Sequence, residues 1–129
     1  MNFAIILLAG PQDPAARSAL NFARAALDAG HQISRLFFYR DAVHLASSLG
    51  VQPQDEADIY ADWRAFISDN QLDAVVCIAA ALRRGVLDSA EATRWKRPVA
   101  NSGAPWALSG LGQWVDSLQT ADRTVTFGT

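Results

Sequence analysis

The chain has 129 residues, half of them hydrophobic, which is enough for the core of one ordinary domain and too few for an independent second one. Its 11 basic and 13 acidic residues give a formal charge of −2, which argues against direct binding to DNA or RNA. The apolar stretch at residues 1–8 is too short to span a bilayer and lacks the basic leader of an export signal. With only one cysteine, the chain is expected in the reducing cytoplasm and away from membranes.

Strand-like and helix-like stretches alternate along the chain, which predicts an α/β fold. Nearly continuous apolar runs indicate strands covered on both faces, and apolar residues at spacings of three and four indicate helices. In chain order, the predicted elements are a strand at 3–8, a helix at 15–29 closed by Gly30, a strand at 32–39, a helix at 41–49, a helix at 58–70, a strand at 72–78, a short helix after it, a weaker helix at 89–95, a loop at 96–105, a helix at 110–118 and a strand at 123–127. Helical crossovers between successive strands predict parallel pairing.

The single cysteine, Cys77, stands where the third predicted strand gives way to a short helix. Reactive groups of open α/β sheets gather there, beyond the carboxyl ends of the strands. The first amide groups of that helix and the charges of Arg83 and Arg84 are candidates for stabilising a thiolate, the reactive form of the side chain. The alternative is an inert core thiol with two ordinary solvated arginines, because free cysteine is among the most buried residue types.

Other chemistries find less support in the sequence. Thioredoxin-type exchange needs a second thiol, and a cysteine hydrolase needs a histidine base, whereas His31 and His44 are expected at a helix end and on a helix surface. Neither histidine has a closely spaced partner ligand, so no metal site is expected. The glycine-bearing turns at residues 9–14 and 109–112 match neither a phosphate loop nor a nucleophile elbow, and Ser109 is expected to cap a helix.

Several segments spread over nearly the whole chain carry a family likeness. They are NFAII at residues 2–6, GH at 30–31, LFFYR at 36–40, CIAAALRRGVLD at 77–88, LSGLG at 108–112 and ADR at 121–123. The sequence resembles the TusD/DsrE family of sulfurtransferase subunits, and the segment from Cys77 is the most specific. The resemblance implies a three-layer DsrE-like fold over residues 1–129, with a mostly parallel central sheet flanked by helices. This chain has Ala121 where some members have a second cysteine, and its loop at residues 95–106 matches poorly.

The resemblance also implies a function. Cys77 would carry sulfane sulfur as a persulfide, without metal or organic cofactor, in a relay from a TusA-like donor to a TusE-like acceptor. The relay would serve 2-thiolation of the wobble uridine of transfer RNA, and the chain would assemble with TusB-like and TusC-like sister subunits in a heterohexamer. Alternatives are a sulfur relay in dissimilatory sulfur oxidation, a non-catalytic subunit of such a complex, and a small-molecule- or nucleotide-binding α/β module. Trp95 and Trp106 flank the poorly matching loop and are candidates either for the core or for a subunit contact.

Overall fold

The computed structural model describes residues 1–129 and contains five strands, five α-helices and one 3-10 helix. The strands are β1 (Asn2–Leu7), β2 (Gln32–Phe38), β3 (Ala74–Cys77), β4 (Trp106–Ser109) and β5 (Arg123–Phe127). The helices are α1 (Pro14–Asp28), the 3-10 helix η1 (Arg40–Ala46), α2 (Ile59–Asp69), α3 (Ile78–Arg83), α4 (Ser89–Arg94) and α5 (Gly112–Thr120). None of these helices combines the length and the apolar character that crossing a membrane requires.

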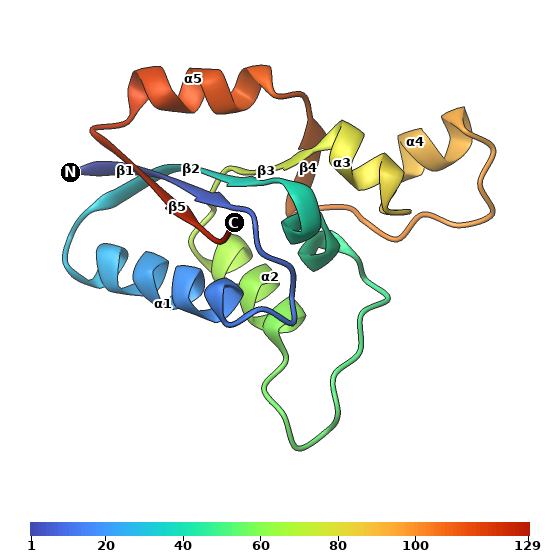
Figure 1. Cartoon of the computed structure of the whole chain (residues 1–129), viewed down its shortest axis with the longest axis horizontal. Coiled ribbons are helices and arrows are strands. Elements are labelled where there is room, and N and C mark those ends of the chain that lie inside the picture. The colour runs from blue at the N-terminus through green and yellow to red at the C-terminus, as the bar shows by residue number, and fades with distance from the viewer.

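The five strands form one sheet in the order β4-β3-β2-β1-β5, and every neighbouring pair is parallel. Helices α1 and α2 cover one face of the sheet and α5 covers the other, as Figure 1 shows. The predicted three-layer α/β architecture is therefore confirmed, and its sheet is parallel throughout. Helices α3 and α4 extend from the end of β3 and project away from the sheet (Figure 1).

Burial on both faces explains why β1 and β3 are apolar without alternation. All four residues of β3 are buried, as are the last four of β1. On the α1–α2 face, the fully buried Trp63 packs edge-on against Phe38, with ring centroids 5.3 Å apart. Its indole N–H donates to the carbonyl of Ala16 at 3.1 Å. Trp63 therefore joins α2 to α1 as well as to the sheet.

Local sequence signals explain where the two long helices begin and end. The carboxylate of Asp13 accepts from the amide of Ala15 at the start of α1, and that of Asp58 accepts from two amides at the start of α2. Gly30 follows α1 with φ of +86°, a conformation in which most side chains would be strained. The predicted end of the first helix is thus confirmed.

Some predicted elements were wrong in kind or in extent. The helix expected at residues 41–49 is the 3-10 helix η1, which ends at Ala46 because Ser47 turns to an extended conformation. The third strand begins at Ala74, not at residue 72. Ser109 does not cap a helix; it is the last residue of β4, a strand that was not predicted. Trp106, the first residue of the same strand, is buried in the core and is therefore not a subunit contact.

We expect Trp63→Ala to lower the free energy of unfolding by about 3–5 kcal/mol, because it removes a large buried ring and the hydrogen bond to α1. The half-exposed Trp95 is a control of the same residue type, and Trp95→Ala should change stability by less than about 0.5 kcal/mol. Urea unfolding of both variants measures the difference. Equal losses would contradict the assignment of Trp63 to the core.

Candidate functional site

Cys77 is the last residue of β3, and α3 begins at the next residue. In the parallel register it pairs with Ser109, the last residue of β4. On the other side, β2 pairs Phe38 with Val76, so that Tyr39 follows at the level of Cys77. The carboxyl ends of three adjacent strands therefore bring Tyr39, Cys77 and Ser109 to one edge of the sheet.

The alternation of side chains shows which layer Cys77 faces. Phe38 packs against Trp63 on the α2 side, so Phe37 and Tyr39 lie on the opposite face. Both of these rings contact Trp114 of α5, with centroids 5.6 and 5.8 Å from it. Val75 pairs with Phe37, which places Val75 and, two residues later, Cys77 on this same face. The thiol therefore points toward the layer formed by α5.

The thiol is closed off in this conformation. Cys77 is only 1% exposed and belongs to the main hydrophobic core. Its side chain makes no capping hydrogen bond to the amides of α3. The sulfur of a second protein can therefore reach Cys77 only after the side chains that bury it have moved.

Arg35 on β2 holds α5 against the sheet. Its guanidinium donates from Nε to Asp73 at 2.8 Å and from Nη1 to both the carbonyl of Gln113 and the carboxylate of Asp116 at 3.0 Å. Burial by itself would lower the pKa of Arg35, but hydrogen bonds to Asp73 and Asp116 and their negative charges raise that pKa above its usual value. The clamp therefore ties the first turns of α5 to β2 and to the residue that precedes β3.

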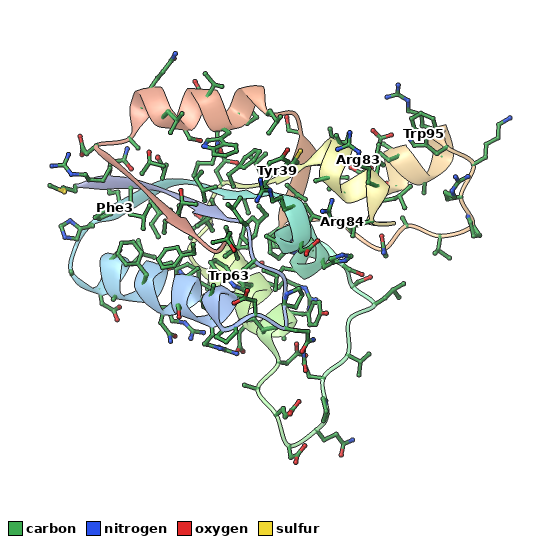
Figure 2. The ribbon with its side chains drawn as sticks, in the orientation of Figure 1. Phe3, Tyr39, Trp63, Arg83, Arg84 and Trp95 are labelled. Atoms are coloured by element: carbon green, nitrogen blue, oxygen red, sulfur yellow. The ribbon has the colours of Figure 1, made fainter.

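Cys77 precedes α3, whereas Arg83 is the last residue of that helix and Arg84 follows it; Figure 2 labels both arginines. Arg84 donates from Nε to Asp41 at 2.9 Å and from Nη1 to the carbonyl of Ala80, which ties α3 to η1. Arg83 is exposed and has no carboxylate within ion-pair distance. It is the sixth residue after Cys77, about 9 Å along the helix axis at 1.5 Å per residue. Neither guanidinium is hydrogen-bonded to the thiol, so their role in stabilising a thiolate stays a prediction.

Comparison with known proteins identifies the family. The model of the DsrE/DsrF-like family matches residues 1–127. A sulfurtransferase TusD homolog from Pseudomonas aeruginosa is 61% identical, over 99% of this chain and 98% of that protein. The putative sulfurtransferase DsrE of Allochromatium vinosum is 44% identical over 99% of both chains, and the sulfurtransferase TusD of Sodalis glossinidius is 40% identical over 95% of both.

This chain belongs to the DsrE/DsrF-like family. The resemblance inferred from its sequence segments is thereby confirmed, and the names of its close relatives support a sulfurtransferase role. The crystal structure of the ychN protein from E. coli aligns with a TM-score of 0.74 over 98% of this chain and 100% of that one, at 18% identity. That likeness shows a shared fold.

The geometry of this family member adds residues that the sequence analysis did not single out. Arg40 follows Tyr39 at the carboxyl end of β2 with φ of +52°, and backbone in this left-handed region often occurs at functional sites. The segment at residues 36–40 contained it, but no sequence pattern indicates its conformation. His31 hydrogen-bonds to the amino-terminal nitrogen at 2.9 Å, at the opposite edge of the sheet from Cys77. No group of three or more His, Cys, Asp or Glu side chains is placed to hold a metal.

We expect Arg35→Met to destabilise the protein by about 1–2 kcal/mol, the value for hydrogen bonds to a charged group discounted for solvent screening. The same substitution should make Cys77 react faster with iodoacetamide, because α5 loses its tie to β2. Mass spectrometry of the native protein at successive times measures that rate. Arg24→Met, at an exposed arginine on α1, is the matched control and should leave the rate unchanged. If both variants react like the wild type, Arg35 does not hold the layer that covers the thiol.

Proposed function

We propose that this chain is a sulfur-relay subunit that carries sulfane sulfur as a persulfide on Cys77. The observation that carries the proposal is the position of its only cysteine, at the carboxyl end of β3, in a member of a family whose close relatives are named sulfurtransferases. The carboxyl edge of a parallel sheet is where reactive groups of α/β proteins gather. Cys77 is therefore the residue to which we assign the chemistry.

The transfer consists of two thiolate exchanges. The thiolate of Cys77 attacks the terminal sulfur of a donor persulfide, the donor's S–S bond breaks, and the donor leaves as a thiolate with the bonding electron pair. An acceptor thiolate then attacks the outer sulfur of the Cys77 persulfide, and Cys77 leaves as the thiolate that began the cycle. Sulfur changes carrier with no net oxidation or reduction. The reaction therefore needs no metal or organic cofactor.

Access to Cys77 requires the covering layer to open in the proposed relay. Gly110 and Gly112 flank Leu111 between β4 and α5, and the space around both glycines is empty. Such a connection allows the first turn of α5 to swing away from the sheet by local opening. Arg84 fixes the position of α3 through its hydrogen bond to Asp41. In the proposed relay, Arg83 and Arg84 therefore stabilise the thiolate without a hydrogen bond to it, by their charge and by the placement of α3.

We assign the relay to 2-thiolation of the wobble uridine of transfer RNA, with TusB-like and TusC-like sister subunits in a heterohexamer, a TusA-like donor and a TusE-like acceptor. The similarity to TusD proteins supports this assignment. In this scheme the chain works in the cytoplasm and contacts neither nucleic acid nor a membrane. The 44% identity to a putative sulfurtransferase DsrE supports sulfur oxidation as the second candidate pathway.

The burial of Cys77 favours one further candidate, a non-catalytic subunit of the same kind of complex. In that case the thiol would be a permanent part of the core, and a sister subunit would supply the active cysteine. The two candidates differ in whether Cys77 ever acquires a second sulfur.

We expect incubation with inorganic polysulfide to add one sulfur atom to the protein, which intact-mass spectrometry detects and which a reductant removes. Cys77→Ser should show no adduct, because it lacks the attacking thiolate. Arg35→Met should be loaded faster than the wild type, because its covering layer is freer. If neither the wild type nor Arg35→Met gains a sulfur atom, Cys77 is not a carrier and the non-catalytic candidate stands.

We expect Gly112→Ala to slow this loading, because alanine restricts the backbone at the first residue of α5. The added methyl group meets no atom within 4 Å, so the substitution should also stabilise the fold by about 0.4–1 kcal/mol. Gly103→Ala is the matched control, since Gly103 also has open space around it but lies in the loop before β4. Unchanged loading of Gly112→Ala would contradict opening at this connection.

A further inference from the structure

A groove lies in the projecting part of the molecule, between the end of α3, α4 and the loop that follows α4. Its volume is about 540 Å³, within the range of about 300–1,000 Å³ that is typical of binding clefts. Leu82, Leu87 and Val99 are among the side chains that line it, and Trp95 stands at its rim, where Figure 2 shows it at the outer end of α4. Cys77 is not among the lining residues.

Buried hydrogen bonds give the groove a fixed shape. Asn101, itself a lining residue, accepts from the amide of Leu87 at 2.8 Å and donates to the carbonyl of Gly85 at 2.9 Å. Its own carbonyl accepts from the amide of Ser48, which follows η1. Asn101 therefore joins both walls of the groove to the body of the protein, so that the groove is a built feature of the fold.

The apolar side chains of the groove are unusually exposed. Trp95 is 48% exposed, Val99 60% and Leu49 65%, so that three of the eight exposed large apolar residues of the chain line this one groove. Clustered exposed apolar groups mark interaction sites on proteins. Trp95 is a candidate for a contact between chains on the sequence alone, and its exposure in the structure is consistent with that role.

Positive charge is concentrated around the same groove. Five of the eleven basic residues and two of the thirteen acidic ones lie between Arg83 and Arg97, which gives this segment a formal charge of +3 and the remainder of the chain −5. The two acidic residues are not free, because Asp88 caps α4 and Glu91 is only 7% exposed. Arg83 and Arg97 line the groove, and no carboxylate lies within ion-pair distance of either.

We infer that the groove binds an acidic segment of a partner protein, whose carboxylates pair with Arg83 and Arg97 while an apolar side chain between them enters the groove. A concave apolar groove lined by two guanidinium groups that have no carboxylate partner suits such a segment, and Arg97 is already oriented there by its hydrogen bond to the carbonyl of Trp95. Nucleic acid fits less well than a short acidic segment, because a long polyanion would extend beyond the groove over the remainder of the chain, whose charge of −5 repels it. This inference rests on the proposed relay, because the relay is what requires a protein partner.

The position of the groove connects it to the thiol. The groove adjoins the last turn of α3, whose first residue follows Cys77. An acidic segment bound there would hold the partner protein about one length of α3, or ~9 Å at 1.5 Å per residue, from the thiol. The groove would thus position a partner without itself taking part in the sulfur exchange.

The test uses a fluorescein-labelled peptide with two central leucines flanked by glutamates, and a matched peptide in which lysines replace the glutamates. Fluorescence anisotropy should show binding of the glutamate peptide alone, weakening as salt is added. Lys96→Glu combined with Arg97→Glu should weaken that binding at least about tenfold, as expected for reversal of charges beside a contact. Arg24→Glu combined with Arg64→Glu makes the same change of charge at exposed arginines of α1 and α2 and should leave binding unchanged.

Three results would overturn the inference. They are equal binding of both peptides, equal effects of the two double variants, and preferential binding of a uridine oligoribonucleotide or of laurate in place of the glutamate peptide. Loading of Cys77 by inorganic polysulfide keeps this inference separate from the proposed function. Lys96→Glu with Arg97→Glu should load like the wild type. Loss of peptide binding with normal loading would therefore report on the groove alone. Normal peptide binding without loading of the wild type would contradict the proposed function of Cys77 and leave the groove in place.

Discussion

Parallel strands can be joined only by crossovers that pass over a face of the sheet, and in this chain the crossovers cover both faces. Two consequences follow from this constraint. The strands at the centre of the fold are buried on both sides and are therefore apolar, as β3 shows, whereas the edge strand β5 keeps exposed polar residues. All their carboxyl ends lie at one edge, which brings together Tyr39, Cys77 and Ser109 from segments that are far apart in the sequence. The candidate site is thus a product of strand direction more than of any local motif.

Because helices cover both faces of the sheet, Cys77 is buried, which favours stability but opposes the access that its chemistry requires. A thiolate must be reached by another sulfur in order to react, yet Cys77 is almost fully buried, on the face of the sheet where Trp114 of α5 packs against Tyr39. For a persulfide carrier this closure has a benefit, because an exposed reactive sulfur is open to irreversible oxidation. Arg35 holds the first turn of α5 against β2, whereas Gly110 and Gly112 allow the backbone at the start of α5 to change conformation. The balance between these two features governs how often the proposed carrier is open.

The elements with strong local signals could be predicted from the sequence, and the others depend on distant partners. β1 and β3 are continuous apolar runs, and α1 and α2 have regular apolar spacing. β4 was missed because it has four residues, follows a loop rich in proline and glycine, and exists through its pairing with β3. The position of Cys77 at a strand end was predicted, whereas its burial was one of two alternatives that the sequence left open, since burial depends on how the layers pack around it. Likewise, nothing near Arg84 indicates that Asp41, 43 residues earlier, binds its guanidinium.

Net charge illustrates how an average can hide the feature that matters. A formal charge of −2 excludes a uniformly basic surface, but it is the sum of +3 between Arg83 and Arg97 and −5 elsewhere. This separation coincides with the projecting part of the fold, so it generates a local field that a neutral surface with mixed charges would lack. Helix α3 connects the two regions: its first turn adjoins the closed thiol, its last turn adjoins the open cationic groove, and Arg84 fixes it to η1. The thiol and a partner held in the groove would therefore lie at opposite ends of the same short helix.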